Sequence, residues 1–201
     1  MRSCFSNRII NLARRKVNFF LSKLTTRWIY FISRLQGISI GKKCMFYGMP
    51  YFEIGNGGKI TIGDNCIFRS SQISNRIGLN HKVIVSATPL SSQTCSIYIG
   101  NNCGFSGTSI WCFKEIIIGN NVRCGANTLI MDGDAHFEDK RTSPPSSIKI
   151  GDNVFLGANV VVKKGVSIGC NTVIGMNSVV THDIPANCIA VGNPCKVIRQ
   201  I

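Results

Sequence analysis

A bulky aliphatic residue recurs at every sixth position between residues 150 and 180. The six positions hold Ile150, Leu156, Val162, Ile168, Ile174 and Val180. A period of six is neither the 3.6-residue period of an α-helix nor the two-residue alternation of a half-buried strand. It fits short strands that each end in a corner and each send one large side chain inward. One such unit cannot bury its apolar side alone, so the sequence predicts stacked coils that form a solenoid.

The fourth residue of each six-residue block predicts how the chain turns. It is Asn at positions 153, 159, 171 and 177, and Gly at position 165. Asn and Gly adopt left-handed backbone at the least cost, which a tight corner requires. The same pattern occurs earlier, in "IGDNC" from Ile62 and "IGNNC" from Ile99. There Cys66 and Cys103 occupy the inward position of Val154 and Val160, which predicts buried free thiols rather than disulfides.

The repeat divides the chain into three parts. Residues 37–184 form the predicted solenoid, and residues 185–201 form a tail that closes its end. Two stretches interrupt the repeat, near 73–96 and 131–147. Long departures from a regular scaffold are where function usually resides. The fold class is therefore all-β, with a short basic α-helical arm at residues 1–36.

The arm carries most of the excess charge. The formal net charge is +14, and residues 1–43 hold ten Lys or Arg and no acidic residue. Roughly helical spacing of aliphatic, aromatic and basic residues predicts one or two amphipathic helices. They either cap the first coil or lie on the anionic inner leaflet of the cytoplasmic membrane, and both roles are compatible. Nucleic acid is not expected, because no recognised reading module accompanies the basic residues.

Two further features bear on location. No apolar run reaches the roughly 18 residues of a membrane span, and no secretory signal is apparent. Ten cysteines without a disulfide pattern indicate a reducing compartment. We therefore expect a cytoplasmic protein, peripheral at the inner face of the membrane if the arm binds lipid.

The repeat "[LIV]-G-x-N-[small]-x" and the ending "GVSIGCNTVIGMNSVVTHDIPANCIAVGNPCKVI" resemble the left-handed β-helix hexapeptide acyltransferases. The resemblance covers most of residues 40–201. It implies a left-handed parallel β-helix shaped as a triangular prism, assembled as a homotrimer with active sites between neighbouring prisms. It also implies acetyl-CoA as co-substrate. The most similar patterns are those of enzymes that O-acetylate polysaccharides and small sugars.

The resemblance therefore implies acetyl transfer to a sugar hydroxyl, in the assembly of a surface polysaccharide such as O-antigen, capsule or exopolysaccharide. Serine or amino-sugar acetyltransferases on the same fold are an alternative. A non-catalytic solenoid that binds membrane or polyanion is another. Consumption of the thioester with a sugar acceptor separates these possibilities.

One histidine stands where the family places its general base. His136 lies in "MDGDAHFED", within the second interruption. An alcohol is a poor nucleophile, so its attack on a thioester needs a base near neutral pKa. Asp132 and Asp134 flank His136 and either orient its ring, accept hydrogen bonds from the sugar or are merely solvated. His81, in the first interruption, is a further candidate for substrate contact, and His182 is interpreted as solvated.

The resemblance also assigns residues to the donor. Backbone groups of Gly157 and Ala158 would pair with the pantetheine arm, and the Gly157 N–H is also a candidate donor to the oxyanion. Further residues would contact the aromatic, adenine and phosphate parts of the donor: Phe155, Lys163, Lys164, Pro194, Lys196 and Arg199. Phe155 replaces the Trp that relatives commonly carry in "IGDNVW".

No metal site is expected. A carbonic anhydrase class with the same prism holds zinc with three histidines, and three are present here. His81 and His136 are 55 residues apart, about three coils of 18 residues, which would separate them by roughly 14 Å along the axis. Zinc–nitrogen bonds are about 2.0–2.1 Å long, so this spacing argues against a shared metal ion.

Overall fold

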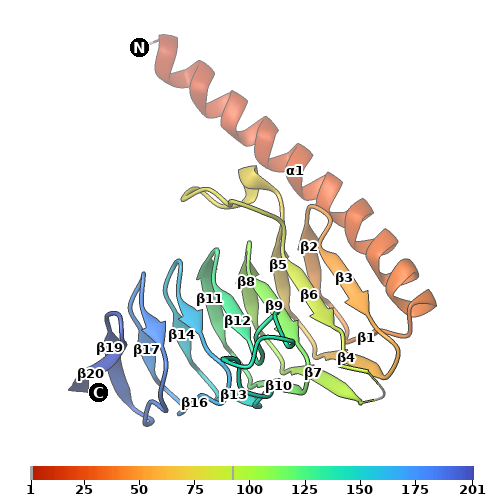
Figure 1. The fold of residues 1–201 in the computed structure, drawn as a ribbon. Helices are drawn as coiled ribbons and strands as arrows, with labels where there is room; N and C mark the ends of the chain where they lie inside the picture. The colour runs from red at the N-terminus through yellow and green to blue at the C-terminus, as the bar shows by residue number, and fades with distance from the viewer. Residues whose placement is uncertain (1, 92) are drawn as a thin grey trace.

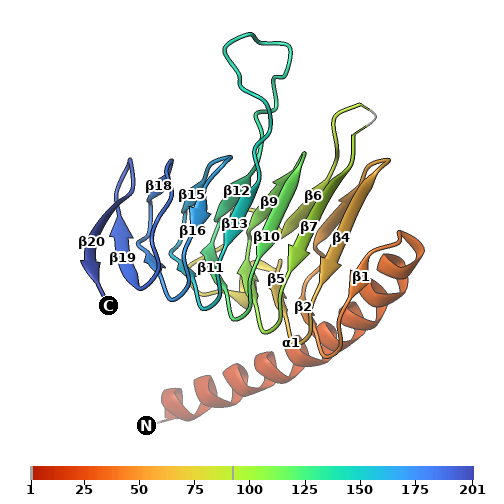
Figure 2. The same cartoon turned by 90° about the horizontal axis from the view of Figure 1, so that it is seen from below.

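The six-residue period produces three parallel sheets that run along a prism, shown from two sides in Figures 1 and 2. The structure is a computed structural model that describes residues 2–91 and 93–201. Sheet A contains β1 (Ser39–Ile40), β4 (Gly58–Ile62), β7 (Cys95–Ile99), β10 (Glu115–Ile118), β13 (Ile148–Ile150) and β16 (Ser167–Ile168). Sheet B contains β2 (Met45–Tyr47), β5 (Ile67–Arg69), β8 (Gly104–Ser106), β11 (Arg123–Ala126), β14 (Phe155–Leu156), β17 (Val173–Ile174), β19 (Cys188–Val191) and β20 (Lys196–Gln200). Sheet C contains β3 (Tyr51–Ile54), β6 (Ile84–Ala87), β9 (Ser109–Cys112), β12 (Leu129–Met131), β15 (Val161–Val162) and β18 (Val179–Val180).

The repeat residues stack in register, as predicted. Ile150 pairs with Ile168 in sheet A, Leu156 with Ile174 in sheet B, and Val162 with Val180 in sheet C. All six are buried. Each coil therefore visits the three sheets in turn, and each aliphatic side chain packs on the one 18 residues away.

The corners also follow the prediction. The four repeat asparagines have φ between 57° and 58°, and Gly165 has φ 79°. At the corner between sheets A and B, side-chain amides form a ladder. Asn121 Nδ2 donates to Asn153 Oδ1 at 3.0 Å, and Asn153 Nδ2 donates to Asn171 Oδ1 at 3.0 Å. Cys66 and Cys103 are buried free thiols, as expected.

The N-terminal arm is one helix, α1 (Arg2–Leu35), rather than two. Its C-terminal half covers the first coil (Figure 1). Ile29 joins the core, and the Tyr30 hydroxyl donates to Gly41 O at 2.5 Å and accepts from Cys44 N at 3.1 Å. Burial raises the pKa of Tyr30 to about 12. The capping role of the arm is confirmed, and within the described residues no helix is both long and apolar enough to span a bilayer.

Two predicted boundaries were wrong. The stretch 73–96 is not one loop, because β6 lies within it as a regular strand of sheet C. It leaves a loop at residues 70–83 between β5 and β6, and a second at residues 88–91 and 93–94. The predicted tail begins too early, at residue 185, since β19 at residues 188–191 still pairs in parallel with β17. Only β20 reverses direction, pairing antiparallel with β19 to end sheet B.

Candidate active site

The second predicted interruption is a loop at residues 132–147, here called the site loop, which projects from the corner between sheets C and A (Figure 2). Asp132 lies at its base and is fully buried. Its carboxylate accepts the backbone N–H groups of Phe113, Lys114 and Glu115 at 2.7, 2.9 and 2.7 Å. The predicted contact of Asp132 with the imidazole or with substrate is therefore wrong. The carboxylate joins the site loop to the corner one coil earlier.

Aromatic packing supports the same loop. The ring of Phe137 meets the buried ring of Phe113 edge-on, with centroids 4.8 Å apart. Phe113 in turn contacts Trp111, again at 4.8 Å. Gly133 packs so closely on Phe113 that a Cβ there would come within 2.7 Å of the ring. This aromatic cluster was not predicted, although its signals in the sequence are the aromatic spacing in "WCF" and the Phe after His136.

An ion pair ties the loop to the following coil. Lys164 Nζ lies 2.5 Å from Asp134 Oδ2 and donates to Ser143 O at 2.6 Å. The Lys164 side chain is only 14% exposed. The sequence predicts that Asp134 contacts the sugar and that Lys164 contacts a donor phosphate. In the structure the two side chains form an ion pair with each other instead.

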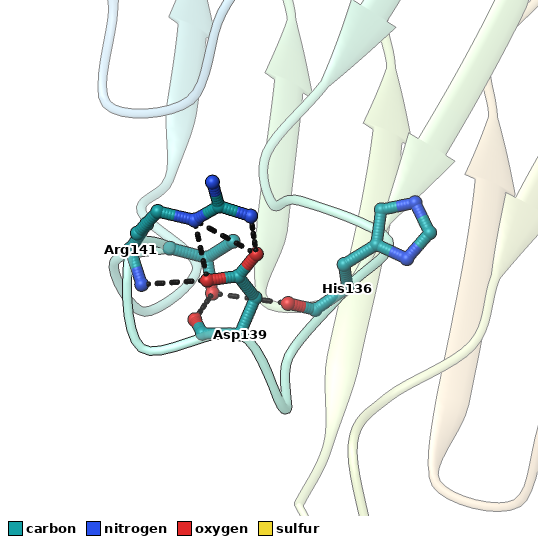
Figure 3. Close-up of polar contacts among 4 residues, drawn as sticks. His136, Asp139 and Arg141 are labelled. Atoms are coloured by element: carbon teal, nitrogen blue, oxygen red, sulfur yellow. Dashed lines mark hydrogen bonds and ion pairs between the residues drawn. The ribbon is translucent and has the colours of Figure 1, made fainter.

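His136 is exposed on the site loop, and only its backbone is engaged. The His136 carbonyl accepts from Asp139 N at 3.2 Å and from Thr142 Oγ1 at 3.1 Å. The Arg141 guanidinium donates two hydrogen bonds to the Asp139 carboxylate, through Nε and Nη2, and holds the pKa of Asp139 below its usual range. Figure 3 shows the imidazole pointing away from this cluster. Among the described residues neither ring nitrogen has a hydrogen-bond partner, so no carboxylate orients the ring.

A cavity of about 840 Å³ lies between the site loop and the loop after β6. Phe137 and Thr142 line it from one side, and Leu90 and Gln93 line it from the other. Lys114 also lines it and brings a cation. The two loops belong to the same corner, as Figure 2 shows, so the chain builds one recess from segments about 45 residues apart.

The predicted donor residues fall into separate places. Gly157 and Ala158 lie at the corner between sheets B and C, whereas Lys163 lies exposed at the opposite end of the sheet C strands. Gly157 N donates to Ile174 O at 2.8 Å, so the predicted pairing of its N–H with the oxyanion or with pantetheine is contradicted. Its close packing on Met176 shows that this glycine serves coil stacking.

The remaining donor candidates lie on sheet B and its end. Phe155 is 48% exposed and faces outward. Arg199 is exposed on the same sheet, opposite Ile189, which pairs with Val173, the partner of Phe155. Pro194 precedes β20 and Lys196 is its first residue, and both are exposed. The chain therefore does not bring His136 and these residues together by itself.

The other two histidines lie apart from His136. His81 precedes β6 at the corner between sheets B and C, and its Nδ1 lies 2.7 Å from Lys82 O. His136 follows β12, at the opposite end of the strands of the same sheet. Only β9 separates β6 from β12, so the offset is two coils rather than the three expected, because the loop after β6 lengthens the coil between β6 and β9. His182 bonds to Thr181 Oγ1 at 2.8 Å through Nδ1.

Comparison with known proteins identifies the repeat. A family model described as "Hexapeptide repeat of succinyl-transferase" matches residues 147–182. The chain carries this repeat in residues 147–182. It is 43% identical over 116 residues to galactoside O-acetyltransferase of Escherichia coli K12. That alignment covers 55% of this chain and 57% of the relative, so the chain spans little more than half the length of that enzyme.

Two solved structures share the fold. The polySia-specific acetyltransferase NeuO is 24% identical with a TM-score of 0.53, and the similarity covers 81% of this chain and 78% of NeuO. AntD, an N-acyltransferase from Bacillus cereus, is 16% identical with a TM-score of 0.59, over 83% of this chain and 86% of AntD. The AntD structure contains dTDP-4-amino-4,6-dideoxyglucose and coenzyme A. At these identities the two structures show the fold alone.

Proposed function

We propose that this protein is an O-acetyltransferase that moves the acetyl group of acetyl-CoA directly to a sugar hydroxyl, with His136 as the general base. One observation carries the proposal. The exposed imidazole has both nitrogens free, yet the loop that bears it is tied to the prism through Asp132, Phe137 and Asp134. A general base needs a free ring nitrogen and a fixed position. The proposal draws further support from the 43% identity to galactoside O-acetyltransferase.

The chemistry follows from this placement. A ring nitrogen of His136 removes the hydroxyl proton as the sugar oxygen attacks the thioester carbonyl carbon. The tetrahedral intermediate then collapses, the carbon–sulfur bond breaks, and the leaving thiolate takes the proton from the imidazolium. The products are the acetyl ester and free coenzyme A, with no net change in the enzyme.

Direct transfer explains the structure better than a mechanism in which a cysteine first takes up the acetyl group. Burial raises the pKa of Cys124 to about 12 and that of Cys95 to about 11. Burial and the neighbouring Asp132 carboxylate also raise the pKa of Cys112, the thiol at the base of the site loop. These groups therefore remain protonated thiols, which are weak nucleophiles.

The acceptor would occupy the recess between the two loops. Its volume of about 840 Å³ lies within the range of small-molecule sites, and it combines the ring of Phe137 with the hydroxyl of Thr142. The acetyl-accepting oxygen would then have to extend beyond the recess to His136, the residue before Phe137. Lys114 gives the recess a preference for an acceptor with a negative group, such as an acidic sugar or a phosphate-linked one.

The donor would lie in a groove completed by a second protomer. Within one chain Lys163 and Ala158 are at opposite ends of the sheet C strands, and a groove between two copies would let one donor contact both groups. The outer face of sheet C carries a half-buried, mostly apolar column, formed in register by Ile84, Ser109, Leu129, Val161 and Val179. Apolar outer faces are suited to subunit contact. We therefore propose a homotrimer with Phe155, Ala158, Lys163, Pro194, Lys196 and Arg199 at the donor groove.

The proposed setting is the assembly of a surface polysaccharide in the cytoplasm, with α1 in peripheral contact with the inner face of the membrane. The deciding experiment is a screen of sugar and amino-sugar acceptors that follows thiol release from acetyl-CoA. Release with hydroxyl acceptors supports the proposal, and release with amino sugars alone would favour N-acetylation. A trimer that binds no acetyl-CoA would favour a non-catalytic scaffold.

A further inference from the structure

The helix α1 packs against the prism with its less apolar face. The side chains that are buried or half-buried along its second half are Ser22, Thr25, Thr26, Ile29, Tyr30, Ile32 and Ser33. Most of them recur at intervals of three or four residues, which places them on one face. Polar or small side chains therefore make much of this contact, with Thr26 Oγ1 accepting from Phe46 N at 3.1 Å. This is the reverse of an ordinary surface helix, which buries its apolar stripe.

The apolar stripe of α1 faces outward instead. It consists of Val17, Leu21, Leu24, Trp28, Phe31 and Leu35, which are four and three residues apart in alternation. Each of these side chains is between 48% and 73% exposed. Phe20 adjoins the stripe and is 62% exposed. An apolar strip of this length on a protein surface indicates a binding surface.

A row of cations runs beside the stripe. Lys16, Lys23, Arg27 and Arg34 are spaced by seven, four and seven residues, so they share one face, and all four are exposed. No acidic residue occurs in the first 43 residues to neutralise them. The helix thus presents bulky apolar residues next to uncompensated positive charge.

The loop at residues 70–83 extends this surface. Ile73 and Ile77 are each 73% exposed, and Arg76 between them is exposed. A groove of about 840 Å³ separates this loop from α1, and Leu21 of the stripe and Arg69 line it. Figure 1 shows the loop beside the middle of the helix. Both elements therefore expose aliphatic residues and arginine on either side of one groove.

We infer that the apolar stripe of α1, its row of cations and the tip of this loop form a docking surface for an anionic lipid bilayer. The stripe would enter the boundary between headgroups and acyl chains, and the cations would remain at the level of the phosphates. This inference deepens the proposed membrane contact by naming the residues, and it does not depend on acetyl transfer. A membrane-bound enzyme of this kind would meet acceptors that carry a lipid.

Charge argues against a second copy of the chain as the occupant. Pairing two α1 stripes would bring two rows of cations together. The prism offers no compensating acidic patch: Asp132 is buried, and Asp134 and Asp139 are already paired. The other six acidic residues are dispersed over β3, β10, the site loop and two corners. Anionic lipid supplies the missing negative charge, at on the order of 1 kcal/mol for each base near the surface.

The test is co-sedimentation of the full chain with phosphatidylcholine vesicles, with and without about one-third phosphatidylglycerol. We expect binding to the anionic vesicles and a blue shift of Trp28 fluorescence, read in a Trp111→Phe background. The double variant Leu24→Asn/Phe31→Asn should bind on the order of 100-fold more weakly. The triple variant Lys16→Gln/Lys23→Gln/Arg27→Gln should lose a similar factor. A matched control, Tyr98→Asn/Met176→Asn, removes exposed apolar groups from the prism and should bind like the wild type.

Two results would overturn the inference. One is vesicle binding that neither helix variant weakens. The other is a loss of oligomer mass in Leu24→Asn/Phe31→Asn without loss of vesicle binding, which would assign the stripe to a second copy. Acetyl transfer to a soluble sugar is measured in parallel and should be unchanged in all variants. A protein inactive on every acceptor would contradict the proposed function while leaving the vesicle result intact.

Discussion

The corner between sheets A and B differs in composition and in shape from the corner between sheets C and A. At the first, coil after coil turns with Gly followed by two polar residues, and amide side chains bond from one coil to the next. At the second, two coils extend into loops that carry His136 and the recess beside it. The regular corner contributes to stability, and in the proposed function the irregular corner supplies the chemical groups. A parallel solenoid allows this separation because each coil contacts mainly its neighbours.

The substitution His136→Ala is the strongest test of the difference between these two corners. We expect kcat to fall on the order of 10²- to 10⁴-fold, because a general base contributes about that factor. Oligomer mass and acetyl-CoA binding should be unchanged, since the ring contacts no other described side chain through a hydrogen bond. His182→Ala is the matched control, because His182 follows β18 at the same corner in a later coil. Equal activity of the two variants would remove His136 from the mechanism.

A second test asks whether the irregular corner also contains purely structural groups. Asp132→Asn should destabilise the fold by about 3 kcal/mol, because an amide has one acceptor oxygen for the three N–H groups that the carboxylate now satisfies. Asp134→Asn, two residues along the same loop, should cost less than about 1 kcal/mol. Urea unfolding measures both. A stable Asp132→Asn protein that fails to bind sugar would restore the original interpretation of Asp132.

The regular part of the molecule could be predicted from the sequence, because one period determines the strand, the inward side chain and the corner together. The stacking of Leu156 on Ile174 and the positive φ of Asn153 both follow from it. Strand β6 could not be found this way, since "VIVSA" carries neither the Gly nor the Asn that marks a repeat. Its place in sheet C depends on pairing with β3 and β9, which are distant in sequence.

The site was predictable in outline and not in detail for a related reason. The position of His136 in an interruption of the repeat was visible, and the structure places it on an exposed loop. The partners of the loop were not visible, since Asp132 bonds to backbone groups 17 to 19 residues earlier and Lys164 lies 30 residues after Asp134. The sequence does not indicate which distant group a polar loop residue contacts. The predicted contact of Lys164 with a donor phosphate therefore differs from the contact in the structure, which is with the site loop.

The regular corner has its own test, with a smaller effect. Asn153→Ala should lower the free energy of unfolding by about 1–2 kcal/mol, because Ala pays for the left-handed backbone at φ 57°. Asn153→Gly removes the same side chain but tolerates the backbone, so it should recover most of the loss. Acetyl transfer should be unaffected in both, as measured by thiol release at saturating substrates. Reduced turnover in either variant would show that the two corners are not independent.

The smallest expected effect separates two adjacent lysines. Lys164→Gln frees the site loop from the following coil, so kcat should fall about threefold to tenfold with little change in the KM for acetyl-CoA. Lys163→Gln should do the reverse, raising that KM several-fold, because its exposed cation is free to meet a donor phosphate.

Because Asp134 is the partner of Lys164, the double variant Asp134→Asn/Lys164→Gln should lose no more activity than either single variant. Additive losses, or a Lys164→Gln protein altered only in donor KM, would mean that Lys164 acts on coenzyme A. In that case Lys164 would both hold the site loop and bind the donor. The structural and chemical roles would then be separated between corners of the prism, but not between individual side chains.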